Sequence, residues 1–217
     1  MPISVDHHEK RAEVIAVASR LIARSGLEGV SVRDIAEAAG CSTAIVSHYF
    51  HSKRELLLLT YNGTIDHATA RAMAALAAQG NHPKAYLAEI MPLDEERLME
   101  WRIWIAFWAK AAADEKFADI QRACVQHSRA VICGILEDEK RNGALPADVD
   151  CALQARRLLT SVMGMAVQVV YDAQDWPIER QHALIDGELN AIYRNAGPAL
   201  RIAAERDNDR KAPVAAQ

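Results

Sequence analysis

The sequence has no long apolar run. Nothing in its 217 residues approaches the ~18 consecutive apolar residues that a membrane-spanning helix needs. The first residues, MPISVDHHEKR, also lack the apolar stretch of a secretory signal peptide. We therefore expect a cytoplasmic protein that has no membrane partner.

Cysteine is scarce, and its spacing argues against cross-links. The chain has four cysteines, far apart in the sequence and without a C-x-x-C pair. This pattern excludes a disulfide framework and predicts reduced, buried thiols. The four are Cys41, Cys124, Cys133 and Cys151.

The motifs of common catalytic and metal sites are absent. There is no G-x-S-x-G, no phosphate-binding loop and no H-E-x-x-H. Cys41, His48 and His51 have a loosely metal-like spacing, but we expect Cys41 in the core of a turn and His48 on an outer face. The run His7-His8-Glu9 does not supply four ligands. We expect no enzyme activity, no cofactor and no metal site.

The excess of positive charge that usually marks a DNA-binding surface is missing. The formal net charge is −4, and residues 1–55 hold seven Lys or Arg and seven Asp or Glu residues. Phosphate contacts in this neutral segment must be few and well placed, so sequence-independent DNA binding should be weak. The acidic runs at 94–96 and 137–139 are interpreted as solvated helix faces.

Strand signals and internal repeats are lacking, whereas apolar residues recur at helical spacing along most of the chain. The predicted fold is all-α, with about nine helices. A three-helix helix-turn-helix domain is expected at residues 1–55, and a larger helical domain for ligand binding and dimerisation at 56–196. Residues 197–217 have few large apolar side chains and are predicted to be disordered.

The segment 31–54 is the most informative stretch. Ser31 and Asp34 have the spacing of a capping box, which predicts a helix that begins at Val32. Gly40 tolerates the positive φ of a helix end, and Ser42 can cap a second short helix. Two short helices joined by a glycine turn are typical of a helix-turn-helix.

The second of these helices has a polar outer face. Ile45, Val46 and Tyr49 are predicted to face inward, and the outward side chains are Thr43, Ala44, Ser47 and His48. Such a small polar face suits a DNA major groove. Ser52 and Glu55 repeat the capping box and predict a third helix, which extends to about residue 79.

A first helix is expected ahead of this motif. Asp6 and Glu9 are predicted to cap it, and Gly26 is predicted to end it after about Ser25. Its apolar face would complete the small core beneath the two short helices.

The run at residues 14–57, VIAVASRLIARSGLEGVSVRDIAEAAGCSTAIVSHYFHSKRELL, resembles the tetracycline-repressor (TetR) family of bacterial regulators. Its most specific part is AAG-x-S-x-x-x-V-S-HYF-x-SK-x-EL, because this spacing continues across three helices. The resemblance implies a homodimeric, all-helical, ligand-responsive transcriptional regulator that binds DNA through its N-terminal quarter.

The residues proposed for DNA contact divide into positioning and reading groups. Tyr49 and Lys53 are predicted to hold phosphates, and Arg33 to contact the backbone or a base edge. His48 would serve either role, although His48 and Tyr49 have the alternative of supporting the small core. The predicted base-edge residues are Ser42, Thr43, Ala44 and Ser47.

A tryptophan-rich segment, WRIWIAFWA at 101–109, resembles choline-responsive repressors of the BetI type within the same superfamily. Trp101, Trp104 and Trp108 fall on one face of a predicted helix. Stacked indoles can form an aromatic cage for a quaternary ammonium, and a choline-like cation is the leading effector. Met163, Gln168 and Tyr171 would complete such a pocket. The alternative is that the tryptophans form ordinary core.

Two apolar helices near the C-terminus, at about 149–173 and 178–195, contain small residues that permit close approach. They suit a homodimer interface of four helices, two from each subunit, although they would also serve as core helices of a monomer. The predicted function is a DNA-binding regulator, expected to be a repressor that a small molecule releases from a near-palindromic operator. The alternative is a helical small-molecule-binding protein of this fold that has lost DNA binding.

Overall fold

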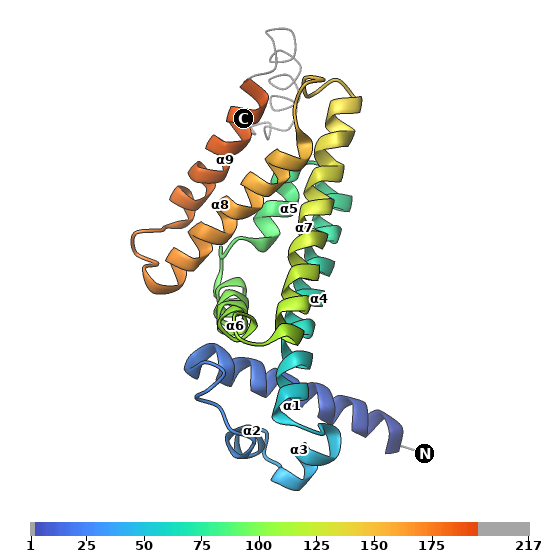
Figure 1. Cartoon of the computed structure of the whole chain (residues 1–217). Coiled ribbons are helices and arrows are strands. Elements are labelled where there is room, and N and C mark those ends of the chain that lie inside the picture. The colour runs from blue at the N-terminus through green and yellow to red at the C-terminus, as the bar shows by residue number, and fades with distance from the viewer. Residues whose placement is uncertain (1–2, 195–217) are drawn as a thin grey trace, which may run out of the picture. The chain divides into compact units, whose positions relative to one another are not determined.

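The computed structural model describes residues 3–194, and this part of the chain contains nine α-helices and no strand (Figure 1). The all-α prediction is therefore confirmed, whereas the predicted tail at 197–217 lies outside the described residues. The helices are α1 (Ile3–Ser25), α2 (Val32–Ala38), α3 (Thr43–Tyr49), α4 (Lys53–Gln79), α5 (Pro83–Ile90), α6 (Glu95–Ala111), α7 (Glu115–Arg141), α8 (Cys151–Tyr171) and α9 (Ile178–Arg194).

The described chain forms two compact units. The first holds residues 3–71, 92–124 and 169–171, and thus α1 to α3, most of α4, α6 and the start of α7. The second holds 72–91, 125–168 and 172–194. The predicted domain boundary at residue 55 falls inside α4 and stays a prediction.

Local capping signals fix most helix ends where the sequence predicted them. Ser31 and Asp34 form the complete capping box at the start of α2. The Asp94 carboxylate caps α6 by accepting from the backbone N–H of Arg97 at 2.8 Å. Gly26 and Gly40 follow α1 and α2 with φ of 70° and 60°, a left-handed conformation that glycine adopts without strain.

The predicted start of the first helix is wrong. Helix α1 begins at Ile3, so Asp6 and Glu9 lie within the helix and not at its start. Helix α5 begins at Pro83, because His82 caps it and proline fits the first helical turn.

The helix-turn-helix has a small apolar core. Helix α1 packs against α2 and α6, and α2 packs against α3. The only fully buried side chain of α3 is Val46, whereas Ile45 is 40% exposed, so the prediction that Ile45 faces inward is wrong. Since α3 has only seven residues, one narrow stripe reaches the core, and Ile45 lies one position, about 100°, to its side. The buried residues are Val14, Ala18, Ile22, Ile35, Ala36, Ala39, Val46 and Phe50.

The second unit has its own apolar core, and α5 packs against α9 within it. All four cysteines of the chain are free, but only Cys151 is buried and the other three are half-buried. No helix within 3–194 is long and apolar enough to cross a bilayer. The core side chains include Ile132, Leu136, Leu158, Val162, Met165, Ile185, Leu189 and Ile192.

One acidic residue of this unit departs from the prediction of a solvated face. The Glu139 side chain is only 12% exposed and accepts a hydrogen bond from the Tyr193 hydroxyl. The His82 imidazole stacks on the Tyr193 ring, with 5.8 Å between the ring centroids. Burial raises the pKa of the Glu139 carboxyl to about 7, although the Tyr193 hydrogen bond opposes this shift.

Candidate nucleic-acid interface and effector site

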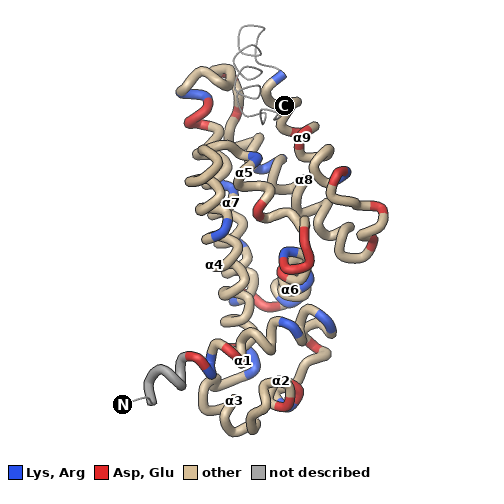
Figure 2. Tube along the Cα trace, turned by 180° about the vertical axis from the view of Figure 1, so that it is seen from behind, with Lys and Arg blue, Asp and Glu red and all other residues tan. Residues whose placement is uncertain are grey.

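Helix α3 presents one exposed face without Lys, Arg, Asp or Glu. Its residues at i, i+1, i+4 and i+5 share a side of the helix, opposite the Val46 anchor. Ser42 caps the helix, since its hydroxyl accepts from the backbone N–H of Ile45 at 3.3 Å. Figure 2 shows α3 without a Lys, Arg, Asp or Glu along its length. The exposed residues are the predicted readers Thr43, Ala44, Ser47 and His48.

The predicted positioning residues surround this face with different degrees of exposure. Arg33 of α2 is exposed, and Lys53 is the first residue of α4, where helical N–H groups have no intrahelical acceptor. Tyr49 is half-buried, with its ring centroid 5.4 Å from that of His48 and 6.4 Å from that of Phe50. A phosphate role and a supporting role are therefore both compatible with the position of Tyr49.

The turn into α4 is held by a variant of the predicted capping box. The Ser52 hydroxyl accepts from the backbone N–H of Glu55 at 3.1 Å, as predicted. The Glu55 carboxylate accepts from the backbone N–H of His51 at 2.8 Å, one residue before the position of a standard box. These bonds fix the chain on both sides of Lys53.

The next cation, Arg54, is not available for phosphate contact, because it is paired within the protein. Its guanidinium forms an ion pair with Asp114, the residue before α7. Its Cζ also lies 5.0 Å from the centroid of the Phe117 ring, a cation–π distance. The Arg54–Asp114 pair was not predicted from the sequence, because the two residues are sixty positions apart.

The structure brings the three tryptophans of α6 together. The centroid of the Trp101 ring lies 5.0 Å from that of Trp104 and 5.7 Å from that of Trp108, both with edge-on geometry. Trp101 and Trp104 are buried, and Trp108 is half-buried. The Trp104 indole N–H donates to the Thr64 hydroxyl at 3.0 Å, whereas the shielded Trp108 Nε1 has no acceptor within the described chain.

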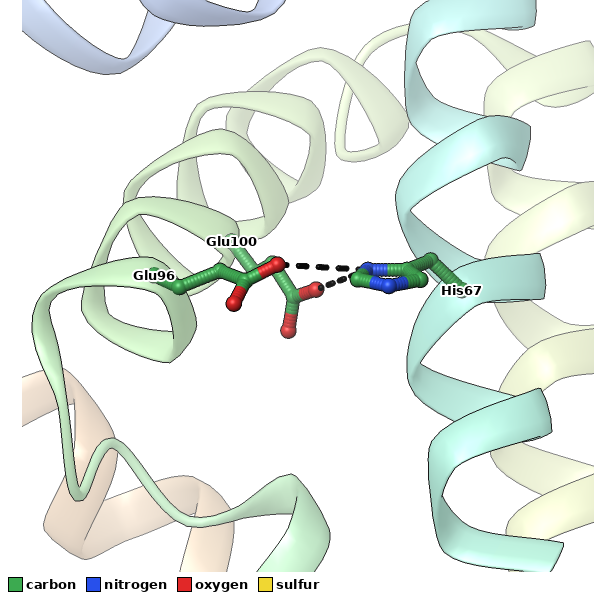
Figure 3. A group of neighbouring side chains, drawn as sticks. All are labelled: His67, Glu96 and Glu100. Atoms are coloured by element: carbon green, nitrogen blue, oxygen red, sulfur yellow. Dashed lines mark hydrogen bonds and ion pairs between the residues drawn. The ribbon is translucent and has the colours of Figure 1, made fainter. Parts of the chain in front are cut away.

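A polar group that the sequence did not predict lies between α4 and α6 of the same unit (Figure 3). Glu100 is buried, and the Arg71 guanidinium donates to both of its carboxylate oxygens, at 2.8 and 3.1 Å. His67 Nδ1 lies 3.3 Å from Glu100 Oε1 and 3.6 Å from Glu96 Oε1. The i, i+4 pairs His67–Arg71 and Glu96–Glu100 were visible in the sequence, but their mutual contact was not.

The other predicted ligand residues lie on α8. Met163 is half-buried and Gln168 is exposed, and both belong to the second unit. Tyr171 is 73% exposed. Their part in effector binding stays a prediction.

Comparison with known proteins decides the family. Residues 14–59 match the model for bacterial regulatory proteins of the TetR family, and residues 83–194 match the C-terminal model of BetI-type transcriptional repressors. The second match alone covers more than half of the chain. The protein is a TetR-family transcriptional regulator. The resemblance seen in the helix-turn-helix and in the tryptophan segment is thus confirmed.

This TetR-family regulator is similar to several named proteins. The transcriptional regulator PksA of Bacillus subtilis strain 168 is 28% identical over 176 residues, which are 79% of this chain and 84% of PksA. The regulator BetI of Burkholderia mallei is 28% identical over 128 residues, 57% of this chain and 66% of that protein.

Solved structures show the same fold. A transcriptional regulator from Rhodococcus sp. Rha1 has a TM-score of 0.76 and 27% identity, and the match covers 86% of this chain and 97% of that one. A regulator from Saccharomonospora viridis, crystallised in complex with choline, has a TM-score of 0.75 and 24% identity, with 82% and 95% covered. At that identity the second likeness establishes the fold alone.

Proposed function

We propose that this TetR-family regulator is a repressor that binds a near-palindromic operator as a homodimer and leaves it when a choline-like cation binds. The observation that carries the proposal is the face of α3, where four small or polar side chains are exposed together while Val46 anchors the helix. A DNA-reading helix needs this division between an anchored side and a polar side.

The proposed DNA contacts follow from side-chain chemistry. The methyl groups of Thr43 and Ala44 suit the methyl group of thymine, and the Ser42 and Ser47 hydroxyls suit base-edge donors and acceptors. Arg33, Tyr49, Lys53 and, in part, His48 would contact phosphates. Because residues 1–55 carry no net charge, affinity must come from these few groups, which favours specific over non-specific binding.

The proposed homodimer would form through α8 and α9. Leu153 of α8 and Ile178 of α9 are large apolar side chains that are about half exposed. In the proposed dimer these two side chains would be buried against the partner subunit as part of one apolar patch. A two-fold dimer of this kind would read two half-sites about 34–36 Å apart, or a multiple of that spacing.

The proposed effector is a quaternary ammonium that carries a hydroxyl or carbonyl group. The ring faces of Trp101, Trp104 and Trp108 would attract the cation. The indole N–H of Trp108, which is shielded and has no acceptor within 3–194, would donate to the oxygen of the ligand. The BetI-type C-terminal match supports this class of ligand.

Footprinting of the DNA that flanks the protein's own gene, with and without choline, tests the proposal. We expect protection of a near-palindromic site that choline abolishes, while an apolar aromatic compound has no effect. Protection that choline does not change would refute the effector. Absence of protection on every flanking duplex would favour the alternative, a ligand-binding protein that has lost DNA binding.

A further inference from the structure

We propose that His67, Glu96 and Glu100 form a binding site for a first-row divalent transition metal such as Zn²⁺. One ligand comes from α4 and two come from successive turns of α6, all within the first unit. Figure 3 shows the His67 imidazole directed toward both carboxylates. One potential ligand atom of each residue lies within 4.8 Å of the other two.

The distances fit a shared metal better than hydrogen bonds. His67 Nδ1 lies 3.3 Å from Glu100 Oε1 and 3.6 Å from Glu96 Oε1, and both distances exceed the ~3.2 Å limit of an ordinary N–H···O bond. Since a ring nitrogen carries one proton at most, it cannot be well aligned with both oxygens. A metal about 2.0–2.2 Å from each ligand keeps its ligand atoms roughly 3 to 3.6 Å apart, which matches the two separations measured from His67 Nδ1.

The ligand types narrow the choice of metal. One imidazole and two carboxylates suit Zn²⁺, Mn²⁺, Fe²⁺ or Co²⁺, whereas Mg²⁺ and Ca²⁺ prefer oxygen ligands alone. Glu100 is held in place, with a side chain only 4% exposed. His67 and Glu96 are 58% and 60% exposed, so the metal would enter from solvent and keep water in its remaining positions.

Arg71 would orient the Glu100 carboxylate of the proposed site. Its Nη2 donates to Glu100 Oε2 at 2.8 Å and its Nη1 donates to Oε1 at 3.1 Å, and this pair of bonds holds the carboxylate with Oε1 3.3 Å from His67 Nδ1. Carboxylate ligands of metals are commonly oriented by such outer hydrogen bonds. The charges of the two carboxylates and the guanidinium sum to −1, so a divalent cation is electrostatically attracted.

The proposed site would link metal binding to DNA binding. A metal would join α4 to α6, and α4 begins with the proposed phosphate contact Lys53. If the two states of the regulator differ in the position of α4, the metal and the operator must change each other's affinity by the same factor. This consequence rests on the proposed repressor function, whereas the metal site itself does not.

Metal binding is tested on the full chain without DNA. Native mass spectrometry and visible absorption spectroscopy with Co²⁺ would be applied to the wild type, His67→Asn and Glu96→Gln. Both substitutions alter exposed side chains, so the variants should fold, as circular dichroism would verify. His127→Asn, which removes an exposed histidine of α7, is the matched control.

We expect one Co²⁺ site in the wild type and in the control, with visible d–d bands and no thiolate charge-transfer band. His67→Asn and Glu96→Gln should each lower the affinity at least about tenfold, because each removes a direct ligand. Three results would overturn the proposal: no bound metal in the wild type, unchanged affinity in His67→Asn, or a charge-transfer band that indicates cysteine ligands. DNA binding is absent from the assay, so failure here would leave the repressor function untouched.

Discussion

The guanidinium of Arg54 donates two parallel hydrogen bonds to the carboxylate of Asp114, from Nη1 to Oδ2 at 2.5 Å and from Nη2 to Oδ1 at 2.6 Å. This bond lowers the pKa of Asp114, which also caps α7 through the backbone N–H of Lys116 at 3.1 Å. The pair therefore fastens the first turn of α4 to the first turn of α7. Because Lys53 directly precedes Arg54, the Arg54–Asp114 pair also fixes the position of Lys53, the proposed phosphate contact.

Arg54→Ala is expected to weaken operator binding without a change in sequence preference, because it loosens the base of α4 and leaves the face of α3 intact. Asp114→Asn should have a similar effect, and the double variant should be little worse than either single one. Fluorescence anisotropy with operator and scrambled duplexes measures both affinity and preference. Arg122→Ala, which removes an exposed ion pair elsewhere on α7, is the control. Strictly additive losses would contradict this role of the pair.

Substitutions in the DNA interface should separate positioning from reading. Lys53→Ala is expected to weaken binding to all duplexes alike and to reduce the slope of log K against log salt by about 1. Ser47→Ala and Thr43→Ser should instead change the preference among operator variants by about 1–3 kcal/mol for each contacted base pair. Competition titrations at several salt concentrations provide the measurement, with the exposed Lys116→Ala as control. The assignment of α3 fails if the Ser47 and Thr43 variants keep both affinity and preference.

Loss of one indole should weaken the proposed effector site. Trp108→Leu is expected to raise the Kd for choline about two- to thirtyfold, since a cation–π contact contributes about 0.5–2 kcal/mol. Operator affinity in the absence of choline should stay unchanged. Isothermal titration calorimetry tests this, with Trp176→Leu, a tryptophan outside the α6 cluster, as the matched control. Equal choline affinity in wild type and Trp108→Leu would rule out the cage.

Glu139 predicts a specific pH dependence of stability. Its folded pKa of about 7 exceeds the ordinary 4.5, so the folded state binds more protons between these values and stability falls as pH rises through this window. The loss would reach on the order of 3 kcal/mol at 1.36 kcal/mol per pKa unit. A protonated His82, whose Nε2 lies 3.7 Å from Glu139 Oε1, would reduce this loss of stability by attraction to the carboxylate.

Glu139→Gln should remove most of this decline, because glutamine still accepts the Tyr193 hydrogen bond but does not titrate. Urea unfolding at a series of pH values from acidic to neutral gives the comparison. Glu179→Gln, at an exposed position of α9, should keep the wild-type profile. Parallel profiles for wild type and Glu139→Gln would show that the carboxyl is not the source.

Helix ends were predictable from sequence because their causes are local. The capping box of Ser31 and Asp34 bonds backbone N–H groups within three residues of itself. Gly40 allows the left-handed backbone conformation directly after α2. The inward orientation of Ile45 was not predictable in this way, since a seven-residue helix offers too few turns to define its buried side. Only the packing of α3 against α2 shows that Val46 is the one fully buried residue of α3.

The site was predictable only where its residues are neighbours in sequence. The exposed face of α3 and the tryptophan stripe of α6 follow from helical periodicity. The contact of His67 with Glu100, by contrast, joins residues thirty-three positions apart, and no local pattern indicates which helix faces which. Glu139 was misjudged for the same reason, because the Tyr193 that covers it lies on another helix.

In the proposed function, two copies of α3, held at a fixed spacing, read the operator. Sedimentation of the full-length protein with a duplex from upstream of its own gene measures this directly. We predict two protein copies on each near-palindromic site and a marked loss of complex when Thr43 and Ser47 are both changed to alanine. A monomer at micromolar concentration, or no complex with any duplex from the native locus, would contradict recognition of the operator by two copies of α3.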